Sequence, residues 1–86
     1  MSNRSWFVYI LRCRDNTFYT GITTDLSRRL AEHNGGKRGA RYTMARRPVT
    51  MVYAEPAPSR SAAARREYQL RRLSAAAKRS LIATSG

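Results

Sequence analysis

An uninterrupted run of aromatic and aliphatic side chains at residues 6–11 constrains the fold more than any other feature. Its sequence, Trp-Phe-Val-Tyr-Ile-Leu, is rich in aromatic and β-branched residues and does not alternate between polar and apolar positions. Such a run favours a strand that is covered on both faces, because both of its sides are apolar. We therefore predict a central β-strand over residues 6–11.

Turn and capping residues divide the rest of the first half of the chain. The turn-forming residues 14–16 lead into a second strand over residues 17–22, so the two strands are expected to form a hairpin. Asp25 is the expected N-cap of a helix that ends near Asn34 or Gly35. The first half is therefore predicted to contain two strands and then a helix.

The second half is predicted to contain a strand and two helices. The strand covers residues 49–54 and is expected to be stopped by Pro56 and Pro58, because proline cannot donate a hydrogen bond to a sheet. Ser59 or Ser61 is the expected cap of the first helix, and Ser74 is that of the second. The order β-β-α-β-α-α predicts an α+β fold, a three-stranded antiparallel sheet with flanking helices.

Length and composition narrow the class of protein. With 86 residues and 42% hydrophobic side chains, the chain is expected to form one domain over residues 1–86, with a core over about 6–82. The lone Cys13 excludes an intrachain disulfide and a cysteine-based zinc site, which is typical of a reducing compartment. The apolar run at residues 6–11 is too short to span a membrane. A soluble, cytoplasmic protein is therefore expected.

The excess of positive charge indicates the kind of partner. Lys and Arg number 17 against 5 Asp and Glu, which gives a net charge of +12, and fifteen of the cations are Arg. Arg forms forked hydrogen bonds to phosphate oxygens. The expected partner is a polyanion, and nucleic acid is preferred to an anionic membrane.

Two tyrosines and a helical pair are candidate site residues. Tyr9 and Tyr19 lie on the two hairpin strands, and they can face each other on one side of the sheet if the hairpin has an odd loop and no bulge. Arg29 and His33 are four residues apart and share a helix face that borders the apolar stripe. The alternatives are a tyrosine pair in a core, a solvated basic face and a histidine near a helix end.

Glu67 is the most informative of the five acidic residues. It lies four residues after Ala63 and three before Leu70, on the apolar side of its helix, where an unpaired carboxylate is costly. One explanation is an ion pair with Arg71 or Arg66. The other is a metal ligand, because Mg²⁺ is commonly held by one carboxylate together with waters and phosphate oxygens.

At these positions the chain resembles the GIY-YIG nuclease domain. Phe7-Val8-Tyr9 stands where that family has Gly-Ile-Tyr, and Tyr19-Thr20-Gly21 stands for Tyr-Ile-Gly. Arg29 and His33 match the helix motif of the family, and Glu67 falls on the later helix that supplies its metal-binding glutamate. The resemblance covers nearly the whole chain and is greatest to the small stand-alone bacterial members.

The resemblance implies hydrolysis of phosphodiester bonds with one divalent metal ion, Mg²⁺ or Mn²⁺. It implies that Glu67 holds the metal and that Arg29 stabilises charge on the phosphate. It also implies that Tyr9 is the general base on the attacking water, that Tyr19 is a positioning group, and that His33 accepts the proton or orients Tyr9. A free phenol has a pKa of about 10, so we expect the surrounding cations to lower the pKa of Tyr9.

A basic loop at residues 37–48 is the expected substrate-holding element. Residues 39–43 read Gly-Ala-Arg-Tyr-Thr, which resembles a loop of the small stand-alone bacterial members. Its cations suit phosphates and its tyrosine can stack on a base. The candidate nucleic-acid-binding residues are Lys37, Arg38, Arg41, Tyr42, Arg46 and Arg47. The alternative is a mobile basic loop with no single role.

Three functional hypotheses follow. The first is a metal-dependent endonuclease of low sequence specificity, acting on DNA rather than RNA, for example in DNA repair or processing. The second is a nucleic-acid-binding module on a nuclease scaffold, with weak or no catalysis. The third is a subunit that depends on a protein partner for its target.

Overall fold

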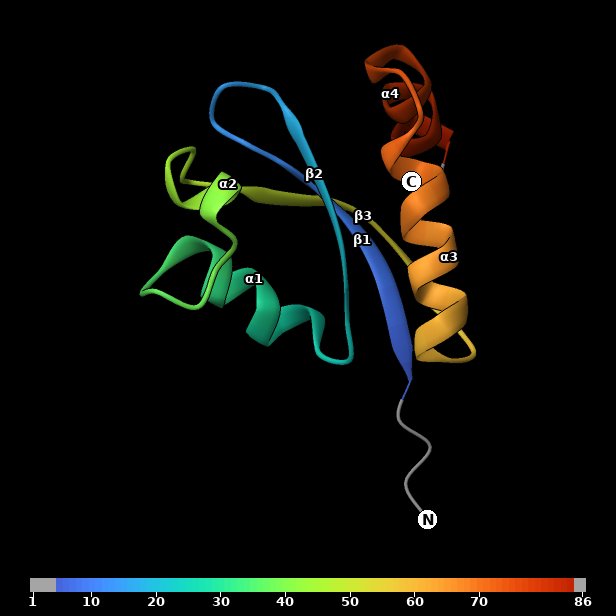
Figure 1. Cartoon of the computed structure of the whole chain (residues 1–86). Coiled ribbons are helices and arrows are strands. Elements are labelled where there is room, and N and C mark those ends of the chain that lie inside the picture. Colours follow the sequence, from blue (N-terminus) through green and yellow to red (C-terminus); the bar gives the residue numbers. More distant parts are fainter. Residues whose placement is uncertain (1–4, 85–86) are drawn as a thin grey trace.

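The computed structural model describes residues 5–84, which form three layers with a sheet in the middle (Figure 1). In chain order the elements are strands β1 (Trp6–Arg12) and β2 (Phe18–Thr23), helices α1 (Leu26–Asn34) and α2 (Arg41–Met44), strand β3 (Thr50–Ala57), and helices α3 (Arg60–Arg71) and α4 (Ala75–Thr84). The predicted order of three strands and three helices is confirmed. The short helix α2 is an addition inside the basic loop.

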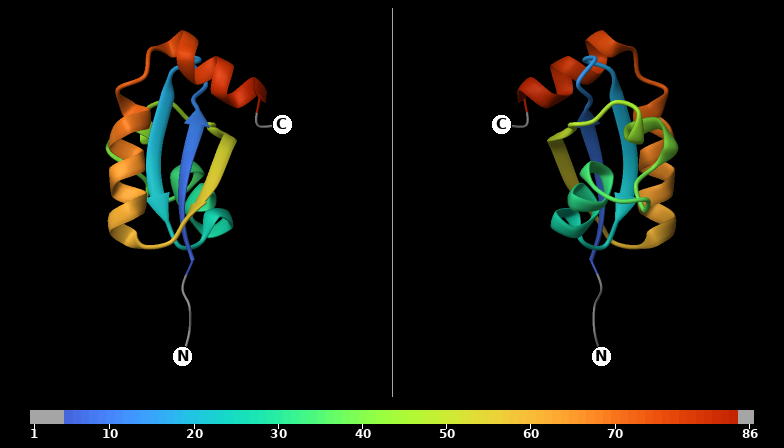
Figure 2. Two further views of the ribbon diagram at one scale, coloured as in Figure 1. Left: turned by 90° about the vertical axis from the view of Figure 1, so that its right-hand side faces the viewer. Right: turned by 90° about the vertical axis from the view of Figure 1, so that its left-hand side faces the viewer.

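Strand β1 forms the centre of the sheet, as its apolar sequence predicts. The strand order is β2-β1-β3, and both neighbours run antiparallel to β1 (Figure 2). Val8 and Ile10 belong to the core cluster that contains the buried residues of α3, whereas Tyr9 and Leu11 belong to the cluster that α1 covers. Successive strand residues point to opposite faces, so β1 supplies both halves of the core.

Side-chain caps start the helices at predicted positions. Asp25 accepts a bond of 3.0 Å from the backbone N–H three residues further on. Ser59 and Ser74 each accept an equivalent bond of 3.1 Å. These bonds satisfy N–H groups that have no partner within their own helix. Of the two serines considered for α3, Ser59 is therefore the cap.

Strand β3 is longer than predicted and contains Pro56. It runs from Thr50 to Ala57, with Pro56 opposite Phe7 of β1. The prediction that Pro56 stops this strand is wrong, whereas the strand does end immediately before Pro58. β3 lies at an edge of the sheet, where a proline is tolerated if its missing N–H would face away from the neighbouring strand.

The hairpin brings the two tyrosines to one face of the sheet but not directly opposite each other. Tyr9 pairs with Gly21, and Tyr19 pairs with Leu11, so the tyrosines are offset by two positions. The turn sets this register, with the N–H of Cys13 donating to the carbonyl of Thr17 at 2.8 Å. The shared face is therefore confirmed, and the direct opposition is wrong.

Helix α4 is the least buried of the four helices within residues 5–84. It contains no buried residue, and the half-buried Leu81 and Ile82 attach it to the core. None of the helices within residues 5–84 is both long enough and apolar enough to cross a membrane. Lys78 of α4 faces residues of β2, whereas Arg79 and Ile82 line a pocket with Arg12 of β1 and Val52 of β3.

Replacing Leu70 with alanine should destabilise the protein. Leu70 is 1% exposed in the cluster between α3 and the sheet, and a cavity there should lower the free energy of unfolding by about 3 kcal/mol. Leu73→Ala is the matched control, because Leu73 is 37% exposed and should cost less than about 1 kcal/mol. Urea unfolding followed by circular dichroism measures both variants, and equal losses would contradict this packing.

Candidate active site

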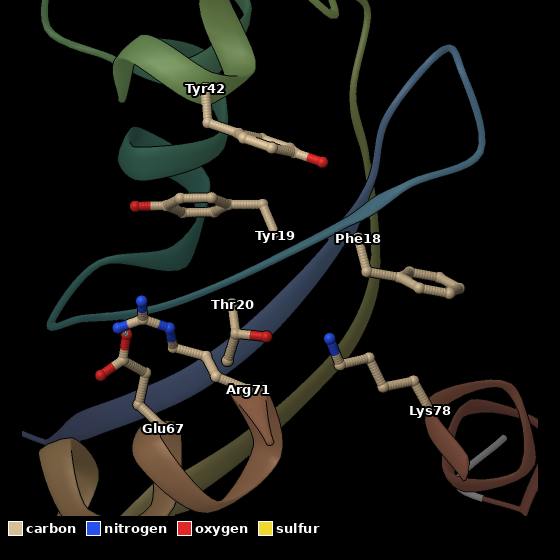
Figure 3. Close-up of a pocket in the computed structure, with 7 residues that line it drawn as sticks. All are labelled: Phe18, Tyr19, Thr20, Tyr42, Glu67, Arg71 and Lys78. Carbon is tan, nitrogen blue, oxygen red and sulfur yellow. Dashed lines mark hydrogen bonds and ion pairs between the residues drawn. The ribbon is translucent and has the colours of Figure 1, made fainter. Parts of the chain in front are cut away.

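A groove of about 400 Å³ lies at the edge strand β2, between the two helical layers. Strand β2 contributes Phe18, Tyr19 and Thr20 to its lining (Figure 3). The other lining residues come from α2, α3 and α4, and they are Tyr42, Glu67, Arg71 and Lys78. Because adjacent residues of β2 point to opposite faces, the groove draws side chains from both layers.

Tyr9 reaches across β2 because Gly21 has no side chain. A Cβ atom on Gly21 would overlap the phenol oxygen of Tyr9 and lie 2.6 Å from its Cζ atom. Such a separation is far inside van der Waals contact, so the phenol can occupy this position only beside glycine. The position of the Tyr9 side chain therefore depends on the glycine of the Tyr-Thr-Gly segment.

Tyr9, His33 and Thr43 form a buried chain of hydrogen bonds. Tyr9 Oη lies 2.8 Å from His33 Nε2, and His33 Nδ1 lies 2.8 Å from Thr43 Oγ1. The hydroxyl of Thr43 donates its one proton to the carbonyl of Ala40 at 2.9 Å, so it must accept from Nδ1. His33 therefore carries its proton on Nδ1, and Nε2 accepts the proton of the Tyr9 hydroxyl.

Burial keeps both partners of the Tyr9–His33 bond uncharged at neutral pH. Burial, with a smaller contribution from Arg29, lowers the pKa of His33 to about 4. Burial raises the pKa of Tyr9 to about 12, while Arg29 opposes the increase and Tyr19 and Glu67 add to it. The expected net lowering of the Tyr9 pKa is therefore not found. Arg29 acts in the expected direction, but burial outweighs it.

Arg29 is held beside Tyr9 by two acceptors. Its Nη1 donates to Oε1 of Glu32 at 2.9 Å and to the carbonyl of Arg38 at 2.8 Å. A guanidinium has five N–H donors, so donors remain for an anion next to the phenol. Glu32 therefore positions the guanidinium of Arg29, a role that was not predicted from the sequence. Its spacing of three residues from Arg29 on one helix could have indicated this contact.

The start of the basic loop is docked on α1 through Gly39. A Cβ atom on Gly39 would lie 2.7 Å from the carbonyl oxygen of Glu32 and 2.9 Å from Cα of His33. This close approach brings Thr43 of α2 within reach of the imidazole. Thr43 was not among the predicted site residues, although it ends the Gly-Ala-Arg-Tyr-Thr segment.

Two arginines of the loop, Arg46 and Arg47, already bind partners within the protein. Arg46 pairs with Asp15 at 3.0 Å, and its guanidinium lies 3.8 Å from the centre of the Tyr42 ring. Tyr42 also stacks on Tyr19, with 6.2 Å between the ring centres. Arg47 donates to backbone carbonyls at the end of α1, at 2.7 and 2.9 Å. Stacking of a base on Tyr42 would therefore require one of its two ring contacts to open.

The other cations of the loop are exposed. They are Lys37, Arg38 and Arg41. Their role in binding nucleic acid, and that of Tyr42, Arg46 and Arg47, stays a prediction. The exposed three are the better placed for it, because they need not leave an internal partner.

Glu67 enters the groove from α3. Its Oε2 atom lies 3.3 Å from Nη1 of Arg71, and its side chain is 22% exposed. The ion pair with Arg71, one of the two explanations considered, is therefore present, whereas Arg66 pairs with Glu55. A partly exposed carboxylate suits a divalent ion that takes its other ligands from water and substrate. Within residues 5–84, no three His, Cys, Asp or Glu side chains gather as a metal cage, and the metal role of Glu67 stays a prediction.

Gly21→Ala should displace the Tyr9 phenol and break its bond to His33. We expect the free energy of unfolding to fall by about 2 kcal/mol, because the added methyl group overlaps the ring. His33 is the one histidine of the chain, so its imidazole ¹⁵N shifts report the loss of the bond to Nε2 directly. Gly35→Ala is the control, because a Cβ there meets only the carbonyl of Ala31, at 3.5 Å. Unchanged His33 shifts in Gly21→Ala would contradict this packing.

Stability should fall as the pH drops below the ordinary pKa of histidine. The unfolded chain takes up a proton at about pH 6.5, whereas folded His33 does so at about 4. Between these values the unfolded state binds more protons, which costs roughly 3 kcal/mol of stability at pH 4. His33→Gln removes this titration, so the unfolding free energy of the variant should change less between pH 7 and 4 than that of the wild type. Urea unfolding at a series of pH values measures the difference, and parallel curves for the two proteins would argue against a buried neutral His33.

Relatives in sequence support a common family. The GIY-YIG catalytic domain matches residues 5–80. A UPF0213 protein of Desulfotalea psychrophila is 53% identical over 81 residues, which cover 94% of this chain and 74% of the relative. A UPF0213 protein of Halobacterium salinarum is 53% identical over 75 residues, which cover 87% of this chain and 96% of the relative.

Solved structures show the same fold. The solution structure of a UPF0213 protein from Bacillus halodurans has a TM-score of 0.60 and 41% identity, and the match covers 95% of this chain and 86% of that one. The solution structure of a protein from E. faecalis has a TM-score of 0.63 and 41% identity, and the match covers 98% of this chain and 90% of that one. The matched residues 5–80 include Tyr9, His33 and Glu67. From its sequence and its architecture, the chain belongs to the GIY-YIG catalytic domain family.

Proposed function

We propose that this protein is a metal-dependent endonuclease that hydrolyses phosphodiester bonds in nucleic acid, with DNA preferred to RNA. The buried hydrogen bond from Tyr9 to His33, beside Arg29, carries the proposal. Glu67 reaches the adjacent groove from the opposite layer. A proton acceptor, a cation and a carboxylate that can hold a metal ion are groups that accelerate phosphodiester hydrolysis. Membership of the GIY-YIG catalytic domain family supports this reading.

The Tyr9–His33 pair can move a proton without forming a free tyrosinate. Tyr9 accepts a proton from the attacking water while its own proton passes to Nε2 of His33. The water oxygen forms a bond to phosphorus, the bond from phosphorus to the leaving oxygen breaks, and the leaving oxygen takes a proton from solvent, to which His33 later returns its own. The resulting imidazolium is held through Nδ1 by Thr43. A bound phosphate raises the pKa of His33, because its negative charge offsets that of Arg29.

Three further side chains complete the site. Arg29 binds non-bridging phosphate oxygens and stabilises the charge that develops in the transition state. Tyr19 positions the phosphate or water, since it lines the groove and its ring centre lies 5.1 Å from that of His33. Glu67 would hold Mg²⁺ or Mn²⁺, which would neutralise charge on the phosphate and the leaving oxygen. For this, the ion pair between Glu67 and Arg71 must open.

Charge supports nucleic acid as the substrate. The net charge is +12, and Lys37, Arg38 and Arg41 of the basic loop are exposed. Phosphate contacts of this kind carry affinity but little sequence information. We therefore propose low sequence specificity, an intracellular role in DNA repair or processing, and a protein partner that selects the target.

The second candidate function is a nucleic-acid-binding module without catalysis. The ion pair between Arg71 and Glu67 favours it, because it engages the carboxylate that would hold the metal. This candidate predicts binding that depends on salt but no cleavage with any divalent ion.

Cleavage by Tyr9→Phe and Glu67→Gln variants separates the two candidates. Labelled duplex, flap and single-stranded DNA and RNA are incubated with Mg²⁺ or Mn²⁺. We expect Tyr9→Phe to slow cleavage by about 10²- to 10⁴-fold, because the proton can no longer pass to His33. We expect Glu67→Gln to abolish metal-dependent cleavage and to leave DNA binding nearly unchanged.

Two control variants keep this experiment specific. Tyr68→Phe removes a phenol that is 58% exposed, and it should cleave at the wild-type rate. Glu55 lies on β3, the edge strand away from the groove, and Glu55→Gln breaks its ion pair with Arg66 of α3. This variant should also cleave at the wild-type rate. Wild-type protein that binds DNA but cleaves none of these substrates would establish the binding module instead.

A further inference from the structure

We propose that Thr20 and Lys78 form a phosphate-binding subsite in the groove, for the nucleic-acid backbone next to the phosphate that is cleaved. The two side chains come from β2 and α4 and point toward each other across the groove (Figure 3). The identity of the ligand rests on the function proposed above. The need for an outside partner rests on the structure of the two side chains themselves.

The hydroxyl of Thr20 lacks a partner. Within residues 5–84 it is the one buried side-chain polar atom without a hydrogen bond, and Thr20 is 5% exposed. Valine would fill the same space without an unsatisfied oxygen, so the hydroxyl is best explained by a ligand. A hydroxyl donates one proton and therefore suits an anion that accepts it.

The ammonium group of Lys78 lacks a counterion. Its half-buried side chain forms none of the ion pairs found within residues 5–84. Glu67, the carboxylate of this groove, is paired with Arg71. No Asp or Glu follows Glu67 in the sequence, so α4 has no acid of its own. The ammonium of Lys78 is therefore available to pair with an anion that enters the groove.

A phosphodiester oxygen satisfies both groups. It accepts a proton from the Thr20 hydroxyl and pairs with the ammonium of Lys78. The groove continues from these residues to Tyr19 and Glu67, so a strand with one phosphate at the reacting centre can place a neighbouring phosphate here. Because α4 contains no buried residue, this ligand would also tie α4 to β2.

Binding of fluorescein-labelled hexathymidylate in EDTA tests the role of Lys78 without cleavage. We expect Lys78→Gln to raise the dissociation constant by about tenfold and to reduce the slope of log K against log salt by about 1. Arg79→Gln is the matched control. It removes the same charge from the next residue of α4, which lines a different pocket together with Arg12, and it should change binding by less than about twofold.

Thr20→Val tests the hydroxyl. The free protein should be as stable as wild type or more so, because a buried unpaired oxygen is removed. Thr20→Val should weaken the binding of hexathymidylate by about threefold or more. Thr20→Ser keeps the hydroxyl and should bind hexathymidylate as tightly as the wild type. Loss of stability with unchanged binding would assign the hydroxyl to folding and overturn the subsite.

The outcomes separate this subsite from the nuclease function. Equal weakening by Lys78→Gln and Arg79→Gln would indicate diffuse attraction and overturn the subsite, even if wild-type protein cleaves DNA. Weakening confined to Lys78→Gln would support the subsite, even if wild-type protein cleaves nothing. A hexaglutamate peptide that competes as well as unlabelled hexathymidylate would overturn the assignment to phosphate.

Discussion

The hydrogen bond between Tyr9 and His33 joins the sheet to helix α1, and the rest of the site is arranged around it. The phenol must cross β2, which requires glycine at position 21. The imidazole must be held at its other nitrogen, which Thr43 provides from the basic loop. Both rings are buried, so a charge on either is costly. The packing of the core therefore sets the protonation states from which catalysis would begin.

The few acidic residues organise the many basic ones. Asp25 caps α1, and the other four acids form ion pairs with arginines, namely Asp15 with Arg46, Glu32 with Arg29, Glu55 with Arg66 and Glu67 with Arg71. Each pair is partly exposed and contributes little to stability by itself. The pairs instead fix the direction of particular guanidinium groups, most clearly that of Arg29 beside Tyr9. The remaining cations are left for a polyanion.

Local signals in the sequence predict the helices and strands but not the tertiary contacts between them. The apolar run of β1 and the caps Asp25 and Ser59 follow from composition and spacing, and they appear as predicted. The offset of Tyr9 from Tyr19 depends on the turn, which shifts the strand register without changing the side-chain pattern. The contact of Thr43 with His33 depends on how a long loop docks, and the raised pKa of Tyr9 depends on burial. Neither property can be read from spacing.

The position of the groove at the edge strand has a consequence for how the protein is made. Tyr9, Arg29 and His33 lie within the first half of the chain, in the hairpin and α1, whereas Glu67 lies on α3, which covers the opposite face of the sheet. During synthesis the hairpin and α1 leave the ribosome before α3. The Tyr9–His33 pair also needs Thr43 of the basic loop and the pairing of β1 with β3, so the site depends on the whole domain. The groove therefore exists only once α3 and the hairpin have packed together, so its two halves are supplied by different ends of the chain.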